Sequence, residues 1–139
     1  MEAFDQTFRE SVRRQSDVDV EFGAFLSGGL DSSLVSAVTR SLHPSRALKA
    51  YTLRFRETSF DEWSFAESVA RQLNMEQVSV WVRPQPEVEF LCLMRLGTVR
   101  RDQRVMGCYL EDSHTIVSVA DPYVLLHEFK HHFEGKFHE

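Results

Sequence analysis

The sequence predicts an α/β protein with a partial, doubly wound parallel sheet, followed by a β-hairpin and a terminal helix. Two observations lead to this fold class. Strand-like and helix-like segments alternate over residues 20–82, which is typical of parallel strands joined by right-handed crossovers. Two apolar runs then flank a Glu-Asp-Ser turn at residues 106–119, which favours a hairpin. The chain has 139 residues, of which 42% are apolar, and this suffices for a hydrophobic core.

The spacing of apolar residues predicts each element in turn. Phe4, Phe8 and Val12 recur at intervals of four, so residues 3–14 are predicted to form an amphipathic helix. By the same patterns we expect strands at 20–26, 49–55 and 77–82 in the order 3-2-1, and helices at 31–42, 59–73, 90–96 and 123–133.

Polar residues mark the expected helix ends. Ser59 and Glu62 have the spacing of a capping box, and Asp121 is the expected N-cap of the last helix, with Pro122 at its first position. The run Arg-Pro-Gln-Pro at 83–86 breaks the alternation, and no further strand–helix alternation is expected after it. We therefore expect two segments, 1–88 and 89–139.

Composition excludes several classes of protein. The net charge of −5 gives no reason to expect nucleic-acid binding, and no apolar run is long enough to span a membrane. The charged N-terminus does not resemble a secretory signal. Cys92 and Cys108 form no CxxC pair, so we expect no disulfide framework and a cytoplasmic protein.

The stretch SGGLDSS, residues 27–33, stands between the first predicted strand and the following helix. Ligands bind at the carboxyl edge of open α/β sheets, and the free N–H groups of a helix N-terminus attract anions. Gly28 and Gly29 let the backbone approach phosphate oxygens, so Gly28→Val is predicted to abolish nucleotide binding without unfolding the chain. The hydroxyls of Ser27, Ser32 and Ser33 add donors. The stretch therefore predicts a phosphate-binding loop.

The loop and its flanks resemble a known family. SGGLDSS is similar to the signature of the N-type ATP pyrophosphatases, the PP-loop or adenine nucleotide alpha hydrolase-like group. GAFLSGGLDSSLVSAV and SFDEWSFAESVARQLN resemble the synthetase domain of glutamine-hydrolysing asparagine synthetases over residues 8–88. By this resemblance ATP and pyrophosphate would be bound by Ser27, Gly28, Gly29, Leu30, Asp31, Ser32 and Ser33. Leu26 and Leu53 would flank the adenosine, with core packing as the alternative for both.

The resemblance also implies a reaction. A carboxylate such as that of aspartate attacks ATP between its α- and β-phosphates with Mg²⁺, and releases pyrophosphate. Ammonia or another amine then intercepts the acyl-adenylate. Asp31 would lie close to the phosphate-bound Mg²⁺ or cap the helix. Asp61 and Glu62 are expected to serve only the start of their helix.

Two parts of the family's pattern have no counterpart in this sequence. Within these 139 residues we expect no glutamine-hydrolysing domain before the loop, and we find no counterpart of the acidic, glycine-rich loop after residue 88. We therefore expect the adenylating module to be incomplete alone, with a partner chain completing its site. A further alternative is an inactive truncated or fused product.

The motif HEFKH, residues 127–131, predicts a different chemistry. On a helix, His127 and His131 share a face and can bind one Zn²⁺, while Glu128 can deprotonate a metal-bound water. His138 is the expected third ligand. Residues 97–139 thus resemble a minimal zincin-type metallopeptidase, which is the alternative function. A terminal helix with merely solvated histidines remains open.

Overall fold

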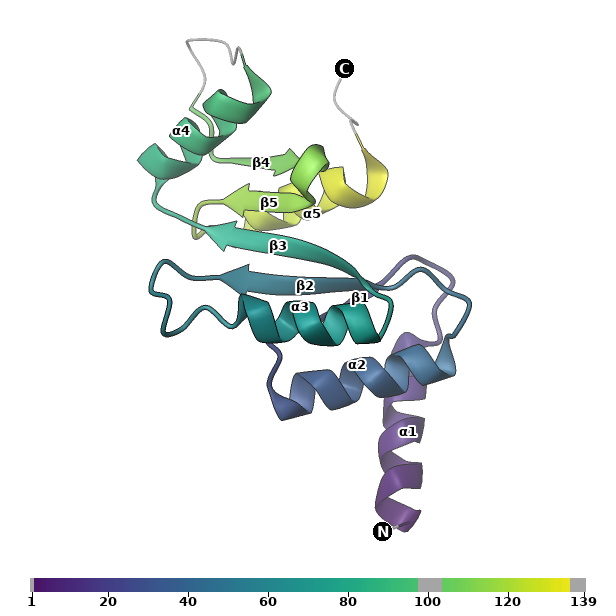
Figure 1. Cartoon of the computed structure of the whole chain (residues 1–139). Coiled ribbons are helices and arrows are strands. Elements are labelled where there is room, and N and C mark those ends of the chain that lie inside the picture. Colours follow the sequence, from purple (N-terminus) through teal and green to yellow (C-terminus); the bar gives the residue numbers. More distant parts are fainter. Residues whose placement is uncertain (1, 98–103, 136–139) are drawn as a thin grey trace. The chain divides into compact units, whose positions relative to one another are not determined.

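The computed structural model describes residues 2–97 and 104–135 (Figure 1). The chain divides into two compact units. The first comprises Met1–Thr52 with Glu62–Gln77, and the second comprises Leu53–Asp61 with Val78–Glu139. Each unit is a mixture of helices and strands, as the α/β fold class predicts. The boundary predicted between residues 88 and 89 falls inside a helix of the second unit.

The first unit contains the expected strand–helix alternation. Its elements are α1 (Glu2–Ser16), β1 (Gly23–Phe25), α2 (Leu30–Leu42), β2 (Lys49–Arg54), which ends in the second unit, α3 (Trp63–Gln72) and the start of β3 (Glu76–Val82). β1 pairs with β2 in parallel, with Gly23 opposite Lys49. The amide of Glu76 donates to the carbonyl of Leu48 at 2.9 Å, so β3 begins beside β2. The order β1-β2-β3 confirms the predicted arrangement of these strands.

The core of the first unit is built from small and branched apolar side chains. Leu26, Leu48 and Ala50 come from the strands and their ends, and they pack with Ala66 and Ala70 of α3. Both alanines are at most 1% exposed. Because an alanine extends little beyond the backbone, α3 can lie close against the sheet.

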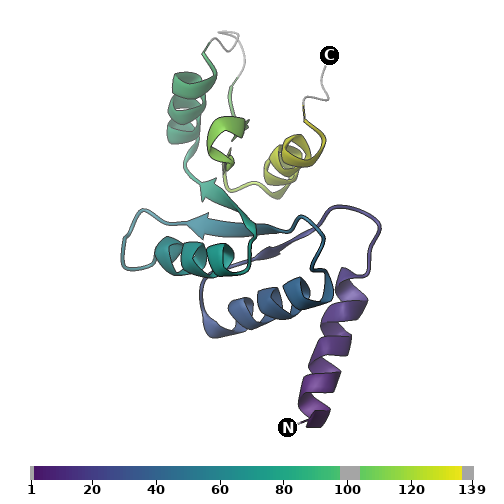
Figure 2. The ribbon, with the colours of Figure 1, turned by 45° about the vertical axis from the view of Figure 1, so that its right-hand side comes forward.

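Helix α1 is attached to the first unit mainly near its C-terminal end. The hydroxyl of Ser16 and Nε2 of His43 are 2.8 Å apart, which links the ends of α1 and α2. Arg46 donates to the carbonyls of Val18 and Val20 in the connection that follows α1. The N-terminal turns of α1 extend away from the other elements of this unit, and Phe4 is 71% exposed (Figure 2).

The second unit holds the hairpin and the terminal helix that the sequence predicts. After β3 come α4 (Gln85–Leu96), β4 (Gly107–Leu110), the short 3₁₀ helix η1 (Glu111–Ser113), β5 (Thr115–Ser118) and α5 (Pro122–Glu134). β4 and β5 are antiparallel, which confirms the hairpin. β5 also pairs with β3 in parallel, from Ser79–Thr115 to Val82–Ser118. The expectation that the alternation stops at the Pro-containing break was therefore wrong, because a further parallel strand follows α4.

A disulfide bond joins α4 to β4 inside the second unit. Cys92 and Cys108 have Cα atoms 6.0 Å apart, and both are buried in a core cluster with Val88 and Val117. The expectation of no disulfide was wrong, because the return of the chain at β4 brings the two side chains together. Separation in sequence alone gave no sign of this approach.

The caps were predicted with mixed success. Oδ1 of Asp121 accepts from the amides of Tyr123 at 2.8 Å and Val124 at 3.2 Å, so this N-cap is confirmed. The capping box was wrong, because α3 begins at Trp63 and Ser59 lies in the preceding turn. No helix within residues 2–97 and 104–135 is long and apolar enough to cross a membrane.

Candidate functional site

The predicted phosphate loop, residues 27–33, follows β1 in the first unit and extends into the first turn of α2, which begins at Leu30. Leu26 fixes the loop at its strand end, since its amide donates to the carbonyl of Tyr51 at 2.9 Å. Its carbonyl accepts from Oγ1 of Thr52, also at 2.9 Å. The Leu26 side chain is 1% exposed and belongs to the core cluster. In this structure it takes the core-packing place that was the alternative to flanking an adenosine.

Gly28 is required by packing against α3. Its φ is +84°, a region that side-chain-bearing residues rarely adopt. A Cβ built at this position would lie 2.6 Å from the amide nitrogen of Ala66 and 2.6 Å from Cβ of Phe65. A side chain at residue 28 would therefore collide with the first turn of α3. This corrects the physical reason given for Gly28→Val, because the substitution disturbs the fold as well as the loop.

Gly29 behaves differently from its neighbour. It is the N-cap of α2, with φ −70° and ψ 166°, which any L-residue can adopt. A Cβ there would meet only Oγ of Ser27, at an ordinary contact distance of 3.4 Å. Gly29 is exposed, so added bulk at this residue would project into the loop's open side. Residue 29 is thus the position at which space for a ligand can be tested without breaking the fold.

A chain of hydroxyl hydrogen bonds holds the loop. The Ser32 hydroxyl donates to the carbonyl of Gly29 at 3.2 Å, and it lies 3.0 Å from the Ser27 hydroxyl. The Ser27 amide donates to Oγ of Ser32, and the Gly29 amide donates to Oγ of Ser27, both at 3.3 Å. Bonds of this length are weak for N–H donors, so a stronger acceptor can displace them. The loop is therefore pre-shaped while its donors stay available for an anion.

The first turn of α2 offers further donors. Its first intrahelical bond runs from the Ser33 amide to the Gly29 carbonyl at 3.1 Å. The amides of Leu30, Asp31 and Ser32 precede that bond, so they have no acceptor within the helix. No side chain caps this N-terminus, and Leu30 is 83% exposed. These residues form an open, positively polarised end with the Asp31 carboxylate in its first turn. Oγ of Ser33 is buried there and has no hydrogen-bond partner among the residues that the structure describes.

Leu53, predicted to flank the adenosine, and Asp61, predicted to serve the start of α3, both belong to the second unit. Leu53 is 45% exposed at the end of β2. Asp61 does not serve the start of α3 with its side chain. It accepts a two-point hydrogen bond from the guanidinium of Arg54, with nitrogen–oxygen distances of 2.8 to 3.0 Å. The helix-start role expected for Asp61 was therefore wrong, because its carboxylate is hydrogen-bonded to Arg54 at the end of β2 instead of to amides of α3.

Arg83 is a polar residue of the second unit that sequence reasoning missed. It directly follows β3, is 8% exposed and stacks on Trp81 with 4.5 Å between the guanidinium carbon and the ring centroid. Its Nη1 donates to the carbonyls of Arg54 at 3.1 Å and Val82 at 3.0 Å, whereas Nη2 has no partner among the described residues. Burial, the largest cause, lowers the pKa of Arg83. In the sequence, Arg83 was noted only as the first residue of the Pro-containing break at 83–86.

The HEFKH motif lies on α5 as predicted. Its two histidines contact each other, whereas its glutamate packs against β4. The rings of His127 and His131 make an edge contact with centroids 4.8 Å apart, and Nδ1 of His131 lies 3.1 Å from the carbonyl oxygen of Gly135. Glu128 is 5% exposed and packs on Gly107 of β4. His138 lies outside the described residues.

The described part of the chain shows no metal site. Within residues 2–97 and 104–135, no group of three or more His, Cys, Asp or Glu side chains is placed to hold a metal ion. A catalytic zinc needs three protein ligands. The structure therefore gives the zinc and metallopeptidase interpretation no support.

Two comparisons with known proteins bear on the loop and its flanks. The family model for asparagine synthase matches residues 3–91. The chain is also 37% identical over 76 residues to the glutamine-hydrolyzing asparagine synthetase 1 of Bacillus subtilis (strain 168). The aligned stretch is 55% of this chain and 12% of that relative, so the two proteins share only a short part of the relative's length. Because the family model covers more than half of the chain, the chain belongs to the asparagine synthase family.

Proposed function

We propose that residues 27–33 bind the phosphates of Mg-ATP and that the chain contributes an adenylating module of the asparagine synthetase type. The observation that carries this proposal is the uncapped N-terminus of α2 beside a loop of weakly engaged donors. Backbone amides at a helix N-terminus are a favourable anion site, and the serine hydroxyls add to it. Membership of the asparagine synthase family supports the same assignment.

The arrangement of the loop fits a triphosphate tail. The amides of Leu30 and Asp31 and the hydroxyls of Ser27 and Ser32 would donate to the pyrophosphate portion. Gly29 would let the backbone approach the phosphate oxygens, since nothing but Oγ of Ser27 lies near its missing Cβ. Mg²⁺ prefers carboxylate oxygens and phosphate together, which suits the exposed Asp31.

The proposed reaction joins a carboxylate to AMP. A carboxylate oxygen of a substrate such as aspartate attacks the α-phosphorus, the bond from this phosphorus to the bridging oxygen breaks, and Mg-pyrophosphate leaves. An amine then displaces AMP from the acyl-adenylate to give an amide. The loop's part is to position the phosphates and neutralise charge on the leaving pyrophosphate, which lowers the barrier without any covalent step on the protein.

Exchange of labelled pyrophosphate into ATP, dependent on aspartate, tests this proposal. Wild type should catalyse the exchange with Mg²⁺ and lose it in a chelator. Asp31→Asn should reduce it at least about tenfold, because a metal-binding carboxylate is removed. Asp19→Asn, an exposed aspartate before β1, is the matched control and should leave it unchanged.

ATP binding is measured separately, by calorimetry on the same variants. If wild type binds Mg-ATP saturably and Gly29→Val weakens this binding, the binding site is retained. If the same protein shows no exchange of pyrophosphate into ATP, adenylation by this chain alone is refuted. The absence of binding at millimolar Mg-ATP would refute the site itself.

A further inference from the structure

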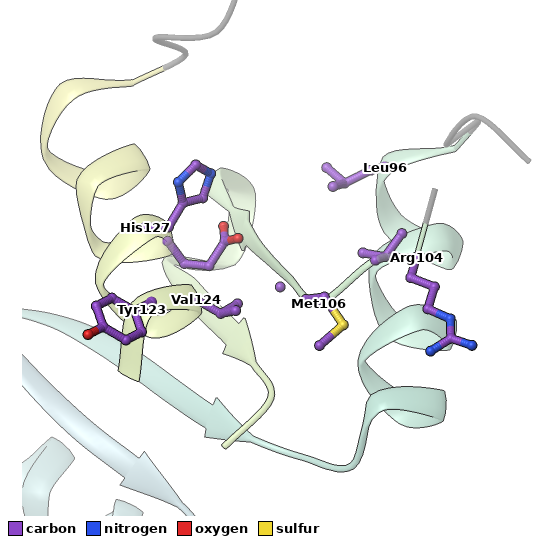
Figure 3. A pocket seen from close by; sticks show the side chains of 9 residues that line it. Leu96, Arg104, Met106, Tyr123, Val124 and His127 are labelled. Carbon is purple, nitrogen blue, oxygen red and sulfur yellow. The ribbon is translucent and has the colours of Figure 1, made fainter. Parts of the chain in front are cut away.

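A pocket in the second unit lies entirely outside the residues that match the family. Its volume is about 530 Å³, and its lining comes from the end of α4, the segment that leads into β4, and α5. Figure 3 shows Val124 and His127 on the α5 side of the space and Leu96 and Met106 on its other side, while the ring of Tyr123 points outward from α5. Most of the exposed lining is apolar, so the pocket suits an organic ligand.

Glu128 of α5 is part of the lining of this pocket. The residue is 5% exposed, and within residues 2–97 and 104–135 no hydrogen bond or ion pair to its side chain is found. Its carboxyl oxygens are not fully buried, so they open onto the pocket. Burying a carboxylate without a donor is costly, and a sequence normally avoids it unless the group has a use. An apolar residue of similar volume would fill the same place at lower cost.

The chain makes room for this carboxyl. A Cβ at Gly107 would lie 2.7 Å from Oε1 and 2.8 Å from Cγ of Glu128, so the glycine of β4 leaves the space that the side chain occupies. The charged and titratable groups that share the lining are Arg104, His127 and Tyr123. Arg104 is exposed, and its side chain extends along the α4 side, away from α5 (Figure 3). The carboxyl is therefore left for a ligand.

We propose that this pocket binds a small organic monoamine, whose ammonium group donates to Glu128 while its apolar body lies against Leu96, Met106 and Val124. An ammonium group neutralises the carboxylate and satisfies its oxygens in one contact, which a neutral donor does not. The unbranched Met106 side chain can adapt to the shape of the ligand's apolar body. Arg104 at the lining disfavours a second positive charge on the ligand.

Benzylamine is the probe for the experiment, with benzyl alcohol and benzoate as its neutral and anionic counterparts. Binding is followed through the methyl resonance of Met106 in methionine-labelled full-length protein. Wild type should give a saturable shift with benzylamine in the millimolar range, with much weaker shifts from the other two compounds. Glu128→Gln should weaken benzylamine binding by at least about tenfold, because a charge-assisted hydrogen bond is lost.

Two further variants keep the test decisive. Glu134→Gln is the matched control on the same helix. Its exposed carboxylate lies 3.6 Å from Nζ of Lys130 and does not line the pocket, so benzylamine binding should stay unchanged. Gly107→Ala should weaken binding as Glu128→Gln does, because the added methyl displaces the carboxyl without removing it. Equal affinity in wild type and Glu128→Gln, tighter binding of benzoate than of benzylamine, or no saturable shift at all would each overturn the proposal.

Discussion

Replacing each of the two adjacent loop glycines by alanine separates their roles. At Gly28 the new Cβ would stand 2.6 Å from the amide nitrogen of Ala66, and φ is +84°. Holding a residue with a side chain in that conformation costs about 1–2 kcal/mol, and an overpacked contact costs about 1–3 kcal/mol more. We expect Gly28→Ala to lower the free energy of unfolding by about 3 kcal/mol.

Gly29→Ala is the matched control for this experiment. Its φ of −70° suits alanine, and the nearest heavy atom to the new Cβ is 3.4 Å away. The remaining cost is the lower preference of alanine for an N-cap, which is below about 1 kcal/mol relative to glycine. Urea denaturation followed by circular dichroism measures both variants. If Gly28→Ala unfolds at the same urea concentration as wild type, or Gly29→Ala loses as much stability, the assignment of Gly28 to packing against α3 is wrong.

Three other predictions concern the second unit. Burial raises the pKa of Glu128 from 4.5 to about 7, so the folded state binds the proton more tightly and wild type loses stability as the pH rises through this window. The free energy of unfolding of Glu128→Gln should therefore equal that of wild type below about pH 4 and exceed it above pH 7 by up to about 3 kcal/mol. The gain is smaller where water entering the pocket screens the charge. The same difference in unfolding free energy at both pH values would contradict this reasoning. Reduction of the Cys92–Cys108 bond, whose partners are 16 residues apart, should cost about 3 kcal/mol, whereas reductant should leave Cys92→Ser unaffected in urea denaturation. Asp121→Ala should cost about 1 kcal/mol through the loss of its two amide contacts, and unchanged thermal unfolding would refute that role.

The sequence was most informative where the signal was local. Among the described residues, apolar periodicity located the α-helices and the strands, although α4 begins at Gln85 rather than at residue 90 and the predicted Glu-Asp-Ser turn is a short 3₁₀ helix. Asp121-Pro122 marked the start of α5, because capping depends on a side chain and the amides two and three residues later. The glycine turn of the SGGLDSS stretch was placed correctly after β1 and at the start of α2 for the same reason, since strand, glycine turn and helix follow one another directly. Its role in nucleotide binding stays a prediction until the exchange experiment is done.

Tertiary structure decided what depends on residues distant in the chain. Gly28 was predicted to make room for phosphate oxygens. In the structure a Cβ at this residue would collide with α3, which begins more than thirty residues later in the chain. Asp61 was predicted to serve the start of a helix, but its carboxylate forms an ion pair with Arg54. Cys92 and Cys108 form a disulfide because the chain returns at β4 and brings Cys108 beside α4. Glu128 looked like a zinc-site base, whereas packing on Gly107 makes it a buried carboxyl in a pocket. Local patterns fix backbone conformation through neighbouring atoms, but the partner of a side chain is set by how the chain folds back on itself.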